Sequence, residues 1–145
     1  MRIAVLNGPN LNLLGQREPE LYGRTSLAEV EALVRGAAKP LDVQVDWFQT
    51  NHEGELVDAV QRLAGQAQGA LINAAALTHS SLPLRDALLA VRVPFVELHL
   101  SNIFAREPER RRSVIADLAL GVITGFGAQS YVLALQGLVG RLRGL

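Results

Sequence analysis

Five short runs that are apolar or alternate between apolar and polar residues, each followed by a segment with helical spacing, constrain the fold of this chain more than any other feature. The runs are residues 2–7, 41–50, 69–73, 93–101 and 120–125, and each is typical of a β-strand. The segments with helical spacing are residues 25–38, 52–66, 80–91, 107–119 and 127–142. Strands that alternate with helices predict an α/β fold, in which helices cover both faces of a parallel sheet.

Right-handed crossovers leave few ways to order such a sheet. We expect a flavodoxin-like three-layer sandwich with five parallel strands in the order 2-1-3-4-5. A length of 145 residues fits a single domain that spans residues 1–145. Ligands of such folds bind at the carboxyl ends of the strands, where the strand order reverses, which here is between the first and third strands.

Composition and missing motifs exclude several classes of function. The formal net charge is zero, which argues against nucleic acid or an anionic membrane as a partner. There is no Cys, and the three His lie in separate segments, so we expect no metal site. Glycine-rich nucleotide motifs are absent, no apolar run reaches about 20 residues, and the first residues are typical of a strand rather than a signal peptide. We therefore expect a cytoplasmic protein.

The loop after the first strand is unusually long. Residues 6–26, LNGPNLNLLGQREPELYGRTS, contain the whole of it, whereas connections of this kind normally take a few residues. It carries Arg17 and Tyr22. The phenol of Tyr has a pKa of about 10, and a nearby guanidinium lowers such a pKa by about 1–3 units. The loop can equally be a solvated segment with an aromatic plug.

Polar side chains follow the third and fourth strands. Asn73 ends the third strand. Glu97, His99 and Ser101 share one face of the fourth, where the Cα atoms of successive residues on a face are about 7 Å apart. A carboxylate that orients an imidazole is a recurring acid–base device. A buried pair that only satisfies itself is the alternative. A nucleophilic triad with Ser101 is disfavoured, because three side chains in line on one strand seldom converge and no G-x-S-x-G elbow is present.

Two arginines follow the fourth strand. Arg106 and Arg110 are four residues apart, so on a helix they would share one face and could meet an anion. A solvated charged face is the alternative.

Several motifs together resemble the type II 3-dehydroquinate dehydratases of the shikimate pathway. They are LNGPNLNLLGQREPELYG, TNHEGELVDAVQ, LTHSSLPLRDAL, ELHLSNIFAREPERRRS and GVITGFGAQSYVLAL, which cover nearly the whole chain in order. The resemblance implies a flavodoxin-like enzyme that converts 3-dehydroquinate to 3-dehydroshikimate and water through an enolate, without a metal or cofactor.

The resemblance also implies roles for five catalytic residues. Tyr22 matches the base that removes the proton α to the ketone, and Arg17 the residue that lowers its pKa. Asn10 matches the residue that holds a water against the enolate oxygen. His99 matches the acid that protonates the leaving hydroxyl, and Glu97 its orienter. On this basis the long loop is a lid that carries the base over the site and excludes water.

Further positions match those that bind substrate in the family. They are Asn73, His79, Ser101 and Arg110, with backbone amides near Leu100 and Ser101 for the carboxylate. Asp86 matches a residue that reaches the site from a neighbouring subunit, and family members are usually dodecamers built from trimers. On its helix, Leu84, Leu88 and Leu89 should face the core, so we expect Asp86 to point away from it.

The chain departs from the family pattern in two places. Residues 72–79, INAAALTH, replace a more usual INPGAYTH, and Phe104 and residues 109–112, ERRR, stand where His is common. These changes concern packing and affinity more than the reaction. The other hypothesis is a flavodoxin-like module that binds a small molecule without catalysis. Retention of Arg17, Tyr22 and His99 together favours the enzyme.

Overall fold

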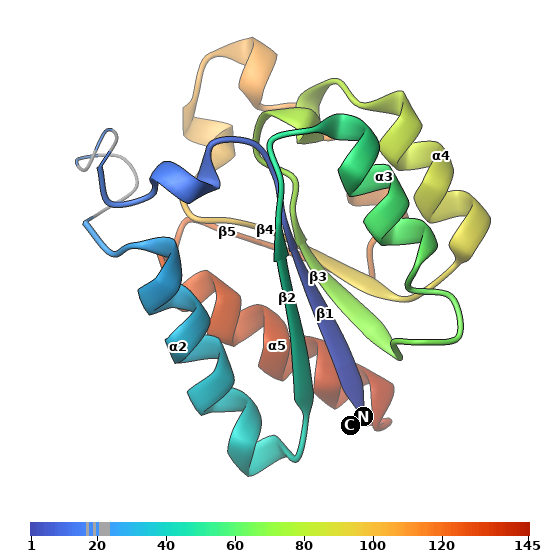
Figure 1. The fold of residues 1–145 in the computed structure, drawn as a ribbon. Coiled ribbons are helices and arrows are strands. Elements are labelled where there is room, and N and C mark those ends of the chain that lie inside the picture. The colour runs from blue at the N-terminus through green and yellow to red at the C-terminus, as the bar shows by residue number, and fades with distance from the viewer. Residues whose placement is uncertain (17, 19, 21–23) are drawn as a thin grey trace.

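The computed structural model describes residues 1–16, 18, 20 and 24–145, and it contains the parallel sheet that the sequence predicts. The strand order is β2-β1-β3-β4-β5, which confirms the expected topology (Figure 1). The strands are β1 (Arg2–Asn7), β2 (Gln44–Gln49), β3 (Gly69–Asn73), β4 (Phe95–His99) and β5 (Gly121–Thr124). In register, Asn7 of β1 lies beside Asn73 of β3, so polar side chains meet at one edge of the sheet.

Helices cover both faces of this sheet. Helices α2 (Leu27–Ala38) and α5 (Gln129–Leu142) lie on one face, and α3 (Glu53–Gln61) and α4 (Leu82–Val91) on the other. Side chains that alternate along β1 divide between the two layers: Ile3 and Val5 pack with α2 and α5, whereas Ala4 and Leu6 pack with α3 and α4. None of the helices in the described residues is long and apolar enough to cross a membrane.

Two helices begin at serine caps. The hydroxyl of Ser26 accepts a hydrogen bond of 3.2 Å from the backbone N–H of Glu29, as the capping pattern predicts. Ser81 accepts one of 3.1 Å from Leu84 in the same way, with Pro83 in the first turn. These bonds satisfy backbone donors that a helix leaves unpaired at its start.

The predicted helix over residues 107–119 is wrong. That segment contains only two short 3₁₀ turns, Pro108–Arg110 and Ala116–Leu118. Between them, the backbone N–H of Val114 donates to the carbonyl of Thr78 at 2.8 Å, a long-range bond that a helix would forgo. The hydroxyl of Ser113 offers the following backbone a second alternative to helical bonding.

Two smaller expectations also fail. Leu89 of α4 is 47% exposed, because the buried stripe of this helix is narrow and consists of Leu84, Ala87 and Leu88. The fourth strand ends at His99, so Leu100 and Ser101 belong to the bend that follows rather than to the strand.

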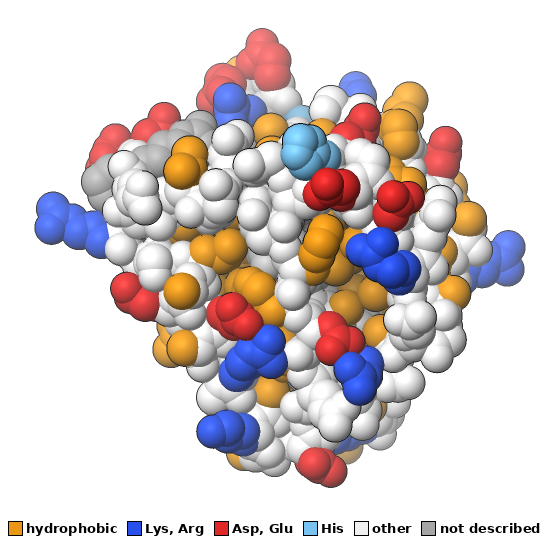
Figure 2. Space-filling model, in the orientation of Figure 1, with side chains coloured by type: hydrophobic (Ala, Val, Ile, Leu, Met, Phe, Trp, Pro, Cys, Tyr) orange, Lys and Arg blue, Asp and Glu red, His pale blue; other side chains and the backbone are white. Residues whose placement is uncertain are grey.

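The surface carries charges of both signs between hydrophobic side chains, and neither sign dominates the face drawn in Figure 2.

Candidate active site

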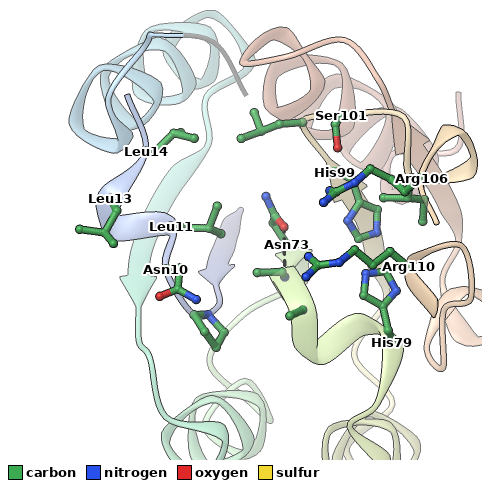
Figure 3. Close-up of a pocket in the computed structure, with 15 residues that line it drawn as sticks. Asn10, Leu11, Leu13, Leu14, Asn73, His79, His99, Ser101, Arg106 and Arg110 are labelled. Atoms are coloured by element: carbon green, nitrogen blue, oxygen red, sulfur yellow. Dashed lines mark hydrogen bonds between the residues drawn. The ribbon is translucent and has the colours of Figure 1, made fainter. Parts of the chain in front are cut away.

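A pocket of about 150 Å³ opens at the carboxyl ends of β1, β3 and β4, where the topology predicts a ligand. Seven of the predicted site residues line it: Asn10, Asn73, His79, His99, Leu100, Ser101 and Arg110. In Figure 3, the asparagine of β3, both histidines and two arginines face one space, and Leu11 faces it from the other side. The sequence motifs thus converge on one cavity although they are far apart along the chain.

Glu97 and His99 form the expected pair on one face of β4. The ring Nε2–H of His99 donates to Oε1 of Glu97 at 2.8 Å. Glu97 is completely buried, and His99 is 5% exposed. Because Glu97 occupies one ring nitrogen, Nδ1 of His99 is the nitrogen left for a ligand in the pocket. The arrangement suits proton transfer to or from a bound molecule.

The bend after β4 is held by the neighbouring edge of the sheet. The hydroxyl of Thr124 donates to the carbonyl of Ser101 at 2.7 Å and accepts from the backbone N–H of Ile103 at 3.2 Å. The backbone N–H of Gly127 donates to the carbonyl of Leu100 at 2.9 Å. These bonds fix the backbone of the two residues that we expect to bind a carboxylate.

Asn73 is held by a buried residue that the motif reasoning missed. Its amide donates to the hydroxyl of Tyr131 at 2.9 Å, and that hydroxyl donates to Oδ1 of Asn7 at 2.7 Å. Asn7 in turn donates to the carbonyl of Phe48 at 3.1 Å. Burial raises the pKa of Tyr131 well above its usual value, against the opposing effect of the bond from Asn73. The only hint in the sequence is an aromatic residue with a polar tip on an otherwise apolar helix face.

The start of the long loop is fitted closely to the loop after β3. The backbone N–H of Gly8 donates to the carbonyl of Asn73 at 2.8 Å, and a Cβ at Gly8 would lie 2.4 Å from the carbonyl oxygen of Ala74. Only glycine allows so close an approach. Asn10 follows with a φ of 69°, and its backbone N–H donates to the side chain of Asn51 at 2.9 Å. The first part of the long loop is therefore anchored beside the pocket.

Two arginines carry the formal charges on the wall of the pocket. Arg106 and Arg110 both line it although they do not share a helix, because Arg110 ends a short 3₁₀ turn that begins after Arg106. Arg110 pairs with Glu107 at 2.6 Å. A backbone hydrogen bond, and after it the charges of the two arginines, lower the pKa of Glu107 against desolvation. The ring of His79 donates through Nδ1 to the carbonyl of Arg112 at 2.6 Å, which leaves Nε2 for a ligand. Among the described residues that line the pocket there is no carboxylate, so the wall suits an anionic ligand.

Asp86 lies apart from this pocket. It is exposed on α4, as expected, and is not among the described residues that line the cavity. Its neighbour Arg85 pairs with Asp117 at 2.6 Å, and the hydrogen bond from Arg85 is the main reason that the pKa of Asp117 is lowered.

Two predicted catalytic residues, Arg17 and Tyr22, lie outside the described residues. The structure describes the chain before them, up to Gln16, and after them, from Arg24 onward. A Cβ at Gly15 would lie 2.8 Å from the carbonyl oxygen of Arg24, so the two ends of the segment are in contact. Within the described part of the chain, no three His, Cys, Asp or Glu side chains gather as a metal site would require.

Comparisons with known proteins agree with one another. Residues 1–139 match the family model of class II dehydroquinases. A 3-dehydroquinate dehydratase from Synechococcus sp. (strain WH7803) is 57% identical over 145 residues, which are 100% of this chain and 99% of the relative. The crystal structure of a type II dehydroquinase from Propionibacterium acnes superposes with a TM-score of 0.91 at 38% identity and 95% coverage of both chains. The crystal structure of a type II dehydroquinase from Butyrivibrio crossotus superposes with a TM-score of 0.92 at 37% identity. The match covers 95% of this chain and 97% of that one.

Proposed function

Because the chain belongs to the class II dehydroquinase family, we propose that its pocket binds 3-dehydroquinate and performs the elimination with the residues described above. The enzyme is a hydro-lyase of the shikimate pathway that forms 3-dehydroshikimate and water. The observation that carries the assignment of roles is the 2.8 Å hydrogen bond between His99 and buried Glu97 at the wall of a cation-lined pocket.

The reaction begins at the carbon α to the ketone. Tyr22, assisted by Arg17, removes a proton from this carbon, and the electron pair of the C–H bond becomes the enolate. Asn10 holds a water against the enolate oxygen. Most of the charge of an enolate lies on its oxygen, and preorganised donors aimed at that oxygen in a closed pocket stabilise it well. The position of Asn10 in the pocket lining supports this role.

The second step expels the hydroxyl. The enolate collapses, the new C=C bond forms, and the C–O bond to the leaving hydroxyl breaks as His99 delivers a proton to it. Water and the enone leave, with no net change in oxidation state. Glu97 orients the imidazole and balances its positive charge, and the hydrogen bond between the two side chains supports this division of roles.

Substrate binding uses the cationic wall. Backbone amides near Leu100 and Ser101 take the carboxylate, and Asn73, His79 and Arg110 hold the remaining polar groups. Support comes from their shared position around one cavity and from the excess of cations there. The reaction as proposed uses no metal or cofactor.

Assembly completes the site. Asp86 reaches the pocket of a neighbouring subunit in a homododecamer built from trimers, and each chain contributes one catalytic domain over residues 1–145. The exposed position of Asp86, away from the pocket of its own chain, supports action in trans. We place the enzyme in the cytoplasm, with no nucleic acid or membrane partner.

The direct test is to add purified protein to 3-dehydroquinate after dialysis against a chelator and to follow near-ultraviolet absorbance. The product enone absorbs there and the substrate does not. We expect steady enone formation that His99→Ala abolishes. Binding of 3-dehydroquinate in calorimetry without any enone would instead identify a binding module and refute the proposal.

A further inference from the structure

The buried carboxylate of Glu97 has a second partner besides His99. The hydroxyl of Ser113 lies 2.7 Å from Oε1 of Glu97, the same oxygen that accepts from His99. The other oxygen, Oε2, is buried and has no hydrogen-bond partner among the described residues. One carboxylate oxygen therefore accepts both bonds, and the two donors together fix how the carboxylate is turned.

The direction of the bond from Ser113 follows from its other partners. Its oxygen accepts from the backbone N–H of Ile115 at 3.2 Å and of Ala116 at 3.0 Å. A hydroxyl has two acceptor lone pairs and one proton. Because both lone pairs are engaged, the proton of Ser113 is directed at Glu97, so Ser113 serves it as a fixed donor.

The segment that carries Ser113 is also tied to the substrate side of the pocket. The carbonyl of Arg112 accepts from the ring of His79 at 2.6 Å, and the N–H of Val114 donates to the carbonyl of Thr78 at 2.8 Å. Ser113 is thus held on both sides by bonds to the loop after β3, which places its hydroxyl independently of β4.

From this geometry we propose that Ser113 is a positioning residue for the acid step. Its hydroxyl fixes the oxygen of Glu97 that holds the imidazole of His99 in the orientation for proton delivery. The inference rests on the proposed role of His99. Without Ser113, Glu97 can turn about its last C–C bond and offer either oxygen, so the imidazole loses its single orientation.

A purely structural role is the alternative, because Ser113 also accepts two backbone hydrogen bonds. Three variants, compared by kcat and by stability, distinguish a positioning role from a purely structural one. Ser113→Ala removes both roles, whereas Ser113→Thr keeps the hydroxyl. Ser81→Ala is the matched control: it removes a buried serine hydroxyl that accepts from the backbone N–H of Leu84, at the start of α4.

The measurements are kcat, KM and solvent deuterium exchange at the carbon α to the ketone, on the full-length protein. A misplacement of about 1 Å at a catalytic group can reduce the rate about 100-fold. We expect Ser113→Ala to lower kcat by about 10- to 100-fold, with KM within about 2-fold and exchange largely retained. Ser113→Thr should recover most of kcat, and Ser81→Ala should lose stability but keep kcat.

A proton NMR spectrum adds a readout of the pair itself. In wild-type protein the downfield resonance of the Nε2–H of His99 should move in Ser113→Ala and return in Ser113→Thr. Unchanged kcat in Ser113→Ala, or equal losses of exchange and elimination, would overturn the inference. If Ser113→Ala does not fold, Ser113→Gly, which also lacks the hydroxyl, replaces it, and a kcat equal to wild type there would count against the role. An inactive wild-type protein would instead overturn the proposed function.

Discussion

The side-chain amide of Asn73 donates a hydrogen bond to the hydroxyl of Tyr131 across 58 residues of sequence. The same hydroxyl donates to Asn7, so one phenol on α5 joins the carboxyl ends of β1 and β3 beneath the pocket. Three buried polar groups thereby satisfy one another, and an amide that we expect to bind substrate is held in one orientation.

Tyr131→Phe should therefore cost both stability and substrate affinity. The ring and its packing beside Trp47, at 5.9 Å between centroids, are kept. Asn7 and Asn73 each lose a buried partner, for which we expect a loss of about 1–3 kcal/mol in the free energy of unfolding. Urea unfolding at fixed protein concentration measures it. KM should rise because the amide of Asn73 is no longer held. A variant as stable as wild type would show that water replaces the hydroxyl.

Tyr131 also predicts how stability depends on pH. Burial raises its pKa in the folded protein, so above pH 10 the unfolded chain releases this proton while the folded chain keeps it. The contribution of the neutral phenol is complete below pH 10 and falls as the pH rises above it, by up to about 1.4 kcal/mol per pH unit. Urea midpoints between pH 8 and 11 should fall more steeply for wild type than for Tyr131→Phe. Parallel curves would contradict the prediction.

For the acid step, His99→Ala should reduce water loss by about 10²- to 10⁴-fold. Proton abstraction by the base does not need the imidazole, so deuterium exchange at the carbon α to the ketone should fall much less. Mass spectrometry of recovered 3-dehydroquinate measures the exchange. Equal reductions in exchange and in elimination would show that His99 does not act on the leaving group.

For the base, Tyr22→Phe should lower kcat by about 10²- to 10⁴-fold while substrate still binds, because only the ionisable hydroxyl is removed. Both exchange and elimination should fall together, unlike in His99→Ala. Arg17→Gln should also be severe and should shift the pH–rate profile to higher pH. Calorimetry with 3-dehydroquinate provides the binding control. Near-normal turnover in Tyr22→Phe would mean that another group is the base.

For assembly, Asp86→Ala should raise KM by about 10-fold, as the loss of one charged hydrogen bond predicts. The matched control is Asp117→Ala, which removes an exposed aspartate that pairs with Arg85. Subunits with Asp86→Ala and subunits with Tyr22→Phe, mixed after dissociation and reassembled, should regain some activity. A fully active monomer in light scattering would refute action in trans.

The topology and one hydrogen-bonded pair of the site could be predicted from the sequence because they follow from the spacing of residues along the chain. Alternation of strands and helices, with right-handed crossovers, leaves few sheet orders, and the expected one is observed. A period of two places Glu97 and His99 on one face, and β4 bears this out with a hydrogen bond of 2.8 Å. The period of two acts over a few residues, and the crossover rule acts on the order of whole elements, so neither rule requires a particular distant side-chain contact.

The supporting shell of the site could not be predicted because its partners are distant. Tyr131 lies 124 residues from Asn7, and no local pattern marks such a contact. Helical spacing also predicted a helix over residues 107–119 that does not form. There, the backbone hydrogen bond from Val114 to Thr78 and the bonds that the hydroxyl of Ser113 accepts replace helical bonds. The donor to Glu97, Ser113, lies in the non-helical part of that segment.

The contact between Gly15 and Arg24 has a consequence for how the sequence between them can be changed. Because the two ends of the segment are already in contact, the residues between them can be replaced without moving the ends. Because the entropy of closing a loop grows slowly with its length, a doubling of the insert costs only about 0.6 kcal/mol. A segment of different length or chemistry, grafted between these two residues, would leave the sheet and the hydrogen bond between Glu97 and His99 as they are.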